Sequence, residues 1–270
     1  MSYSDIFRTR SFEKEPFGTM FRGVEWLVRQ QANSPRIFEV GFGPCLFRMQ
    51  LQSVKRKFGS AGIFVLRQYY EPLLEFGAGL ISKGSYVIDG GANQGIYTCA
   101  FAAKVGPGGM VFSFEPQAYA VECLKINVDL NGFNNTRVFE GAVSDKSGSV
   151  FLNLDGGPVA AFISDAPKND DVIEVTSFAI DDLLASKDIA HVEFMKLDVE
   201  GAELRALTGA ERLIDACKPI ICIESGEKKL YDKICEHLGR KGYKPYVFDG
   251  KGALIRPSGF SPWPNVFFMC

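Results

Sequence analysis

From about residue 85 onward, the pattern of hydrophobic and polar positions predicts strands that alternate with turns and helices. Residues 86–89 (YVID) are a short apolar run that predicts a buried strand, residues 90–95 are a glycine-rich turn, and residues 96–104 predict a helix. Residues 110–115 (MVFSFE) predict the next strand, and Pro116 suits the first turn of a following helix because its φ is fixed. Two strand–helix units in succession predict parallel strands.

The same rhythm continues along the rest of the chain. Residues 219–224 (PIICIE) are continuously apolar, which is typical of a strand covered on both faces. Further strands or extended segments are expected at residues 137–143, 149–154, 172–178, 192–198, 243–248 and 265–270, with helices at 181–185, after 198 and at 228–241. The expected fold class is α/β, with a Rossmann-like sheet that is mostly parallel and has an antiparallel C-terminal strand.

The N-terminal part departs from this rhythm. Residues 18–31 predict a helix, and residues 36–40 and 45–51 around Gly41-Phe42-Gly43-Pro44 predict a hairpin. We expect residues 1–80 to be an extension that caps the ligand edge of the sheet or packs beside it, with an oligomer contact as a further alternative. Residues 81–270 would then form the main domain.

Composition excludes several classes of function. The chain has 270 residues, 23% of them charged, and a formal net charge of −2, so no bulk attraction to nucleic acid is expected. Apolar runs are too short to span a membrane, and the N-terminus lacks the apolar centre of a secretory signal, which predicts a cytoplasmic protein. The seven cysteines include no CxxC pair, so we expect free thiols and neither a disulfide framework nor a zinc site.

The glycine-rich turn is the first candidate for a binding site, because ligands of open α/β sheets bind at the carboxyl ends of the strands. It reads Asp89-Gly90-Gly91-Ala92-Asn93-Gln94-Gly95. A dinucleotide fingerprint would require glycine at position 92. Asp89 would repel a pyrophosphate but attract an ammonium group, and S-adenosylmethionine has both an ammonium and a carboxylate.

Glu115 is the second signal. It ends the next expected strand and follows Gly95 by 20 residues, near the spacing at which an acidic side chain accepts hydrogen bonds from ribose hydroxyls. The turn and Glu115 together favour an adenosyl ligand.

With these features the sequence resembles the FkbM-type methyltransferases over about residues 70–224. The matching motifs are Tyr70-Glu71-Pro72, VIDGGANQGIYT at 87–98, FSFEP at 112–116, AVSDKSGSV at 142–150 and FMKLDVEGAE at 194–203. The resemblance implies a class I methyltransferase that uses S-adenosylmethionine, most often on a hydroxyl oxygen of a sugar, glycolipid or polyketide-type natural product.

The resemblance also implies roles for individual residues. Asp89, Gly91, Asn93 and Gly95 would surround the methionine part of the cofactor, and Glu115 would hold the ribose. Ala142 and Val143 would border the adenine, and Asp145 would reach its amino group or organise a turn. Ala92, Pro116 and Asp198 complete the expected set of cofactor contacts.

Candidate catalytic residues follow the strand at 192–198. Asp198 and Glu200 are two apart and, in an extended chain, would point to the same side over the ligand edge. They would divide the work between cofactor and acceptor or bind a divalent cation; we favour a metal-free site. Glu200 and Glu203 have the alternative role of stabilising the next helix N-terminus. Glu224 ends a neighbouring strand and is a further catalytic candidate.

Lysine and histidine are weaker candidates for the site. Lys196 alternates with Asp198 and Glu200 and can pair with one of them. His191 and His237 are expected to be structural.

The leading hypothesis is O-methylation of a small-molecule or glycan hydroxyl. A nicotinamide-dependent oxidoreductase, an inactive cofactor-binding module and an RNA methyltransferase are the alternatives. The missing glycine at position 92 argues against the oxidoreductase. The slight excess of acidic over basic residues argues against the RNA methyltransferase.

Overall fold

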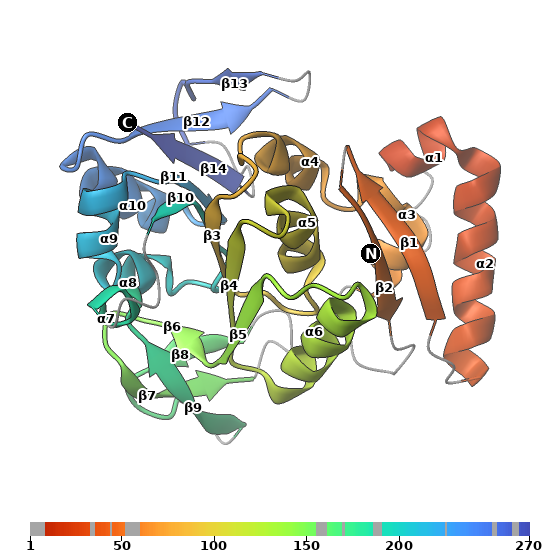
Figure 1. Cartoon of the computed structure of the whole chain (residues 1–270), viewed down its shortest axis with the longest axis horizontal. Coiled ribbons are helices and arrows are strands. Elements are labelled where there is room, and N and C mark those ends of the chain that lie inside the picture. Colours follow the sequence, from red (N-terminus) through yellow and green to blue (C-terminus); the bar gives the residue numbers. More distant parts are fainter. Residues whose placement is uncertain are drawn as a thin grey trace.

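The computed structural model describes residues 9–32, 36–43, 45–51, 60–154, 161–168, 171–185, 191–224, 226–249, 253–260 and 265–270 (Figure 1). Its helices are α1 Arg10–Lys14, α2 Pro16–Ala32, α3 Ser60–Leu66, α4 Pro72–Gly79, α5 Ile96–Val105, α6 Ala118–Leu130, α7 Ile180–Ala185, α8 Glu203–Thr208, α9 Glu211–Cys217 and α10 Lys228–Gly239. Its strands are β1 Arg36–Phe42, β2 Cys45–Leu51, β3 Tyr86–Gly90, β4 Met110–Glu115, β5 Thr136–Glu140, β6 Ala142–Val143, β7 Gly148–Asn153, β8 Phe162–Ser164, β9 Val172–Phe178, β10 Val192–Leu197, β11 Ile220–Glu224, β12 Lys244–Phe248, β13 Leu254–Ile255 and β14 Asn265–Met269.

The central sheet has the order β13-β12-β14-β11-β10-β3-β4-β5. The strands from β11 to β5 are parallel, and β14 lies antiparallel between β11 and β12. The prediction of a mostly parallel Rossmann-like sheet with an antiparallel C-terminal strand is confirmed. The strand order reverses beside β3, because the chain first builds β4 and β5 on one side of it and then returns to β10 on the other. Such a reversal is where open α/β sheets bind ligands.

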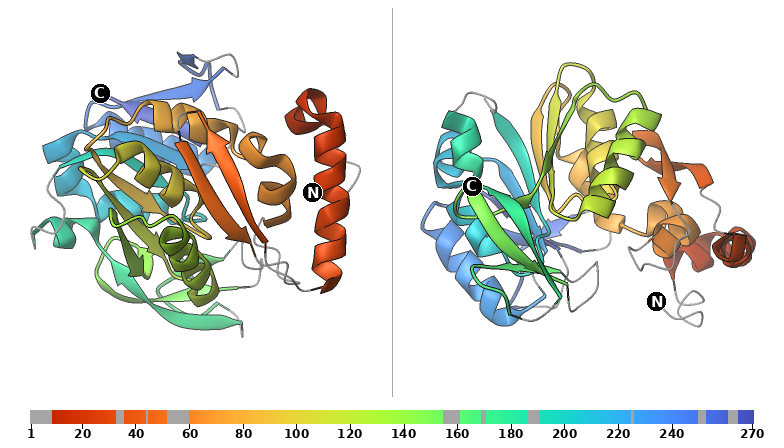
Figure 2. Two further views of the ribbon diagram at one scale, coloured as in Figure 1. Left: turned by 45° about the vertical axis from the view of Figure 1, so that its right-hand side comes forward. Right: turned by 90° about the horizontal axis from the view of Figure 1, so that it is seen from below.

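Helices cover both faces of this sheet (Figure 2). On one face, residues of α4 and α5 pack with Val87 of β3 and Val111 of β4 in a core that extends to the N-terminal hairpin. On the other face, residues of α8, α9 and α10 pack with Ile88 and Phe112. Val87 and Ile88 are both completely buried, which explains why the strand reads as an unbroken apolar run.

A smaller sheet, β6-β9-β7-β8, stands apart from the central one at the β5 side (Figure 1). The single extended segment expected at residues 137–143 is divided at Gly141 into β5 and β6, which belong to different sheets. A Cβ at position 141 would collide with the carbonyl oxygen of Thr176, so glycine allows the chain to pass close to β9 as it changes sheets.

The expected helix after residue 198 is also divided. It consists of α8 and α9, which are separated at Gly209. A Cβ at Gly209 would overlap the backbone of Ser144, so this position is in close contact with the chain that enters the small sheet. Helices α1, α3 and α4 and the short strands β8 and β13 were not predicted.

The N-terminal hairpin packs on the outer side of α5 and α6. Its β2 edge bonds to side chains of α6: the Arg48 amide donates to Asn131 Oδ1 at 2.7 Å, and the Gln50 amide donates to Asn127 Oδ1 at 2.6 Å. Asn side chains therefore satisfy amides on the edge of β2 opposite to β1, where no strand pairs within the described residues. Pro44, in the expected turn, lies outside the described residues. The division of the chain at residue 80 stays a prediction.

Within the described part of the chain, no helix is both long enough and apolar enough to cross a membrane.

Candidate functional site

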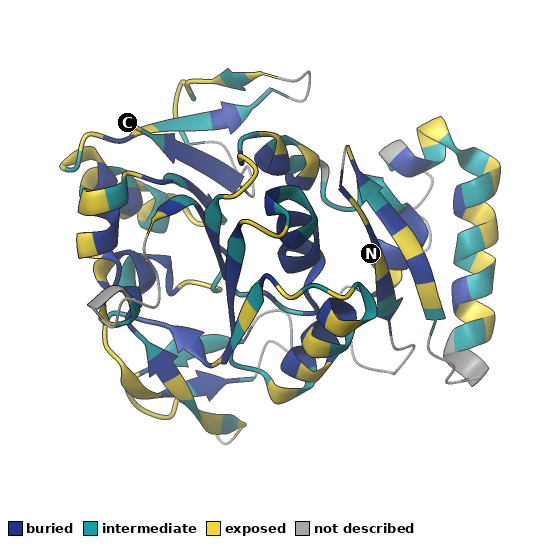
Figure 3. Ribbon diagram, viewed as in Figure 1, coloured by how far each residue is buried: buried dark blue, intermediate teal, exposed yellow. Residues whose placement is uncertain are grey.

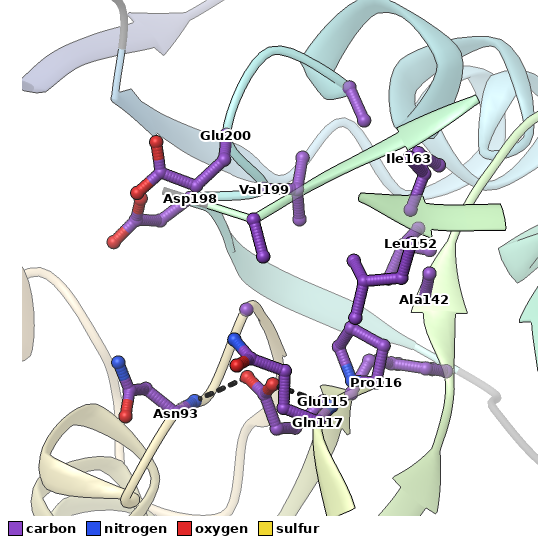
Figure 4. A pocket seen from close by; sticks show the side chains of 15 residues that line it. Asn93, Glu115, Pro116, Gln117, Ala142, Leu152, Ile163, Asp198, Val199 and Glu200 are labelled. Carbon is purple, nitrogen blue, oxygen red and sulfur yellow. Dashed lines mark hydrogen bonds between the residues drawn. The ribbon is translucent and has the colours of Figure 1, made fainter. Parts of the chain in front are cut away.

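A pocket opens where the carboxyl ends of β3, β4 and β10 meet (Figure 4). It contains about 610 Å³ of empty space, part of which is open to solvent, and this is a volume typical of small-molecule sites. Its lining residues are Gly91, Asn93, Phe114, Glu115, Pro116, Gln117, Ala142, Val143, Leu152, Ala161, Ile163, Asp198, Val199, Glu200 and Ala202.

The floor of the pocket is the glycine-rich turn after β3. Gly91 has φ +78°, and a Cβ there would overlap the carbonyl oxygen of Asp198, so only glycine lets the turn approach the end of β10 this closely. Asn93 also has a positive φ, 49°. Its side-chain Oδ1 is buried without a hydrogen-bond partner, which leaves an acceptor for a ligand donor beside the pocket.

Glu115 is held in place at the end of β4. Its Oε2 accepts the amide of Asn93 at 2.8 Å, and its Oε1 accepts the amide of Gln117 at 3.0 Å (Figure 4). The residue is only 4% exposed, and burial raises the pKa of its carboxyl group to about 7 although both hydrogen bonds lower it. Each carboxylate oxygen has a second lone pair, so this side chain can still accept hydrogen bonds from two ligand hydroxyls.

The opposite wall of the pocket is apolar. Ala142 and Val143 come from β6, and Leu152 and Ile163 come from β7 and β8 of the small sheet. Figure 4 shows Leu152 and Ile163 on the side away from Asn93 and Asp198. The pocket therefore has a polar end at the central sheet and an apolar end at the small sheet, an arrangement suited to a ligand with a ring system at one end.

A buried lysine connects the strands beneath the polar end. The register of β10 on β3 places Lys196 beside Asp89. Its Nζ lies 3.1 Å from Asp198 Oδ2, 3.9 Å from Asp89 Oδ1 and 4.4 Å from the ring centroid of Tyr97. Lys196 is 3% exposed and Asp89 is completely buried, so these two charges compensate each other beneath the pocket, while Asp198 reaches the pocket surface. The nearby carboxylates raise the pKa of Lys196 although burial opposes this, which keeps the ammonium charged.

Asp89 faces this group of charges. Its Oδ2 accepts a 2.6 Å hydrogen bond from Thr98, and its Oδ1 has no hydrogen-bond partner. Its pKa is raised, chiefly by burial. Asp89 thus lies under the pocket floor and aligns Lys196, which in turn holds Asp198 at the pocket surface.

A second hollow adjoins the pocket and shares Asp198 and Glu200 with it. It encloses about 1070 Å³ of empty space that is open to solvent, and it is lined by Asp198, Glu200, Gly201, Glu203, Glu224, Gly226, Glu227, Lys229, Leu230 and Lys233. Burial and the neighbouring Asp198 and Glu203 raise the pKa of Glu200 to about 7. Glu224 also has a raised pKa, because it is partly buried and its carboxyl is hydrogen-bonded to the Asp198 carboxylate. We call this second space the acidic hollow.

A sequence profile of the methyltransferase FkbM domain matches residues 89–245, from the end of β3 into β12. The chain belongs to the FkbM methyltransferase family. Membership excludes the nicotinamide oxidoreductase alternative and implies S-adenosylmethionine as the methyl donor.

Known FkbM proteins and other methyltransferases are similar to parts of this chain. The 31-O-demethyl-FK506 methyltransferase FkbM of Streptomyces tacrolimicus is 30% identical over 161 residues, which are 48% of this chain and 61% of that protein. The crystal structure of methyltransferase FkbM from Methylobacillus flagellatus matches 94% of this chain and 60% of its own with a TM-score of 0.48 and 14% identity. Fibrillarin from Aeropyrum pernix, solved with natively bound S-adenosyl-L-methionine, matches 71% of this chain and 68% of its own with a TM-score of 0.44 and 10% identity. The chain thus spans about three fifths of the two FkbM relatives.

The structure separates the expected FkbM cofactor residues into two groups. Gly91, Asn93, Glu115, Pro116, Ala142, Val143 and Asp198 line the pocket. Asp89, Ala92 and Gly95 do not. Ala92 packs against Leu124 and Val128, and Gly95, with φ +88°, allows the turn to pass Leu124 closely. These three residues shape the turn from beneath, so a direct contact between Asp89 and an ammonium group is not part of this geometry.

The expected geometry of Asp198 and Glu200 needs a correction. Strand β10 ends at Leu197, and Glu200 has φ 49°, so the chain between them is not extended and strand alternation does not orient them. A turn brings both side chains to the same side instead (Figure 4). Glu203 accepts the amides of Val199 and Gly201 with Oε1 and so stabilises this turn at the start of α8.

Other expected residues have structural partners. Asp145 accepts a 2.8 Å hydrogen bond from Arg205 Nε, whose charge and hydrogen bond lower the pKa of the Asp145 carboxyl despite partial burial, and it does not line the pocket. His237 lies 3.8 Å from Glu211 on the outer helices. Among the residues that the structure describes, no group of three or more His, Cys, Asp or Glu side chains is arranged to hold a metal ion. The preference for a metal-free site stays a prediction.

Several pocket residues were missed. Gln117, Val199 and Ala202 are next to motif residues, so proximity alone could have indicated them. Leu152 and Ile163 are different, because they come from a separate sheet. The alternation of Val150 and Leu152 is a signal for Leu152, and it does not extend to Ile163 on β8.

Proposed function

We propose that this FkbM protein transfers a methyl group from S-adenosylmethionine to a hydroxyl oxygen of a sugar, glycolipid or related natural product. The observation that supports this most is the junction of the two spaces. The pocket and the acidic hollow meet at Asp198 and Glu200, so a ligand in one would approach a ligand in the other at two carboxylates.

The residues of the pocket fit the proposed cofactor. Glu115 would accept hydrogen bonds from the ribose hydroxyls, and the buried Oδ1 of Asn93 would accept one from the amino-acid part. Gly91 leaves room for a close backbone approach, and Leu152, Ile163 and Val143 would cover the adenine. When bound, the cofactor would supply an electrophilic methyl group on a sulfonium.

The acidic hollow fits an acceptor with several hydroxyl groups. Carboxylates accept hydrogen bonds that hydroxyls donate, and a protonated carboxyl accepts with its carbonyl oxygen, so Asp198, Glu200 and Glu224 can orient such an acceptor. Positioning of the oxygen would provide much of the rate enhancement. The Streptomyces relative is named a 31-O-demethyl-FK506 methyltransferase, and this name supports an oxygen as the methylated atom.

Glu200 is the proposed general base. It lines both spaces, and a pKa of about 7 lets it take up a proton near neutral pH. Glu224 would keep its own proton and donate it to Asp198 in a hydrogen bond, which fixes Asp198 between Glu224 and Lys196.

The cofactor assignment is tested by Glu115→Gln. Calorimetry is expected to show that the wild type binds S-adenosylmethionine and its demethylated product but not NAD. In the variant an amide NH₂ replaces one acceptor oxygen, so affinity should fall about 10- to 100-fold through loss of charge-assisted hydrogen bonds worth about 1.5 to 3 kcal/mol.

Glu140→Gln is the matched control. Glu140 pairs in register with Glu115 on the adjacent strand, but it is exposed and ion-paired with Lys125. Its substitution should leave affinity unchanged. NAD binding by the wild type, or equal affinities for both variants, would contradict the assignment.

A further inference from the structure

The outer face of α2 is apolar, although it faces solvent. Between Pro16 and Arg29, every exposed side chain is hydrophobic. The exposed fractions are Phe17 86%, Phe21 70%, Val28 62%, Val24 61%, Met20 49% and Leu27 37%. Figure 1 shows α2 at the margin of the molecule beyond the hairpin, and Figure 3 colours its exposed positions yellow. We call these six side chains the α2 stripe.

The inner face of the same helix is the more polar one. Arg22 donates to the carbonyl oxygen of Val65 at 2.8 Å and is ion-paired with Glu15, and Thr19 is hydrogen-bonded to Ser11. Trp26 is the buried apolar anchor, 5.3 Å from the ring of Phe64. An isolated surface helix would have the opposite distribution, with apolar residues inside and polar residues outside. The α2 stripe therefore has the composition of a face that is covered in the functional state.

The spacing of the stripe indicates a helical occupant. Phe17, Met20, Val24 and Leu27 repeat at intervals of three and four residues, and Phe21 and Val28 widen the stripe on one side. This is the pattern by which a helix packs into a helix bundle.

The charges around the stripe favour a protein over an anionic lipid surface. A lipid-binding helix presents lysines and arginines beside its apolar face to the headgroups. Here Arg22 pairs with Glu15, and both Arg29 and Arg36 pair with Glu25. Two glutamates thus pair with these three arginines, which leaves one excess positive charge among them, fewer than a helix that binds anionic headgroups presents.

The area of the stripe is sufficient for a dimer. Its exposed side-chain surface is on the order of 600 Å² per copy, since a single aromatic side chain has about 150 to 250 Å². Two copies would bury roughly 1,200 Å², the lower limit for specific interfaces, before any contribution from neighbouring residues. We propose that α2 packs antiparallel against α2 of a second copy of this chain, so that the two stripes cover each other about a two-fold axis. In this arrangement Phe21 of one copy lies opposite Val24 of the other, because both are next to the centre of the stripe.

The test is the oligomeric state of the full chain in sedimentation velocity. The wild type is expected to be a dimer at micromolar concentrations, and Phe21→Glu should weaken dimerisation roughly 100-fold or more by burying a charge at the centre of the contact. Ile173→Glu is the control, because Ile173 is a 43% exposed apolar residue on β9, far from α2. It should remain a dimer. A native circular dichroism spectrum and a cooperative thermal transition for Phe21→Glu would show that the monomer is folded, and its unfolding temperature should be lower than that of the wild type because the dimer no longer stabilises the fold.

Mixing two variants tests the antiparallel geometry. Phe21→Glu and Val24→Lys should each be monomeric alone and should form a heterodimer when mixed, because one Glu–Lys pair then replaces two unfavourable contacts. A monomeric wild type, a dimer that persists in Phe21→Glu, or no recovery on mixing would overturn the proposal. Binding of a monomeric wild type to phosphatidylserine vesicles, lost in Phe21→Glu, would overturn it in favour of a lipid occupant.

Discussion

Replacing Glu200 by Gln is expected to lower turnover by about 100-fold or more while S-adenosylmethionine affinity stays within a few-fold, because the amide keeps the shape of the side chain but cannot accept a proton. Single-turnover methyl transfer to a hydroxylated acceptor, with calorimetry of the cofactor, measures both quantities. Glu140→Gln is the matched control and should keep full turnover, since Glu140 is exposed, pairs with Lys125 and lines neither space. Full activity of Glu200→Gln would reject the general-base role.

The pH profile provides an independent check of the same residue. A base must be deprotonated to act, and the pKa of Glu200 is raised to about 7. Turnover of the wild type should therefore fall about tenfold per pH unit below pH 7 and level off above it. The residual activity of Glu200→Gln should lack this limb. A limb that persists in the variant would assign the titration to another group, such as Glu224.

Replacing Lys196 by Met is expected to reduce the free energy of unfolding by about 3 to 5 kcal/mol, because it leaves Asp89 and Asp198 without their shared cation in a buried site. Met keeps apolar contact with Tyr97, so a cavity contributes little. Urea unfolding measures the difference. Lys125→Met is the control, because the exposed Lys125–Glu140 pair should be worth less than about 1 kcal/mol.

The pH dependence of this loss identifies its cause. In the variant, Asp89 has no cation to offset its burial, so its folded-state pKa rises further above the unfolded value. A carboxyl with a raised folded pKa destabilises the fold as pH increases through the interval between the two values. The deficit of Lys196→Met should thus be larger at neutral pH than at acidic pH. A deficit that does not vary with pH would indicate a packing defect instead.

The local sequence was sufficient to predict where the central residues of the candidate site lie in the fold. The turn 90–95 and Glu115 could be placed because each directly follows an apolar strand, and parallel strands deliver their carboxyl ends to one edge. Sequence spacing could not predict where each side chain in the motif points. Asp89 belongs to the same motif, yet it points under the turn to Thr98 and Lys196, a fact that depends on the register between β3 and β10.

Long-range packing produced the features that were missed. Leu152 and Ile163 reach the pocket only because the chain changes sheets at Gly141, and a glycine between two apolar segments does not by itself specify a second sheet. Likewise, the positive φ of Glu200 overrides the two-residue alternation that would hold in a continued strand. In both cases tertiary contacts decide the backbone conformation, which the local sequence leaves open.

The position of β14 has a consequence for how the chain is made. Strand β14 follows β12 in the sequence but lies between β11 and β12, and it pairs with both. During synthesis on the ribosome, β11 is therefore present with an unsatisfied edge of apolar residues until residues 265–269 emerge and enter the gap. An open apolar edge is a site for pairing with other nascent chains. In the interval between translation of β11 and of β14, this edge of β11 is therefore open to such pairing.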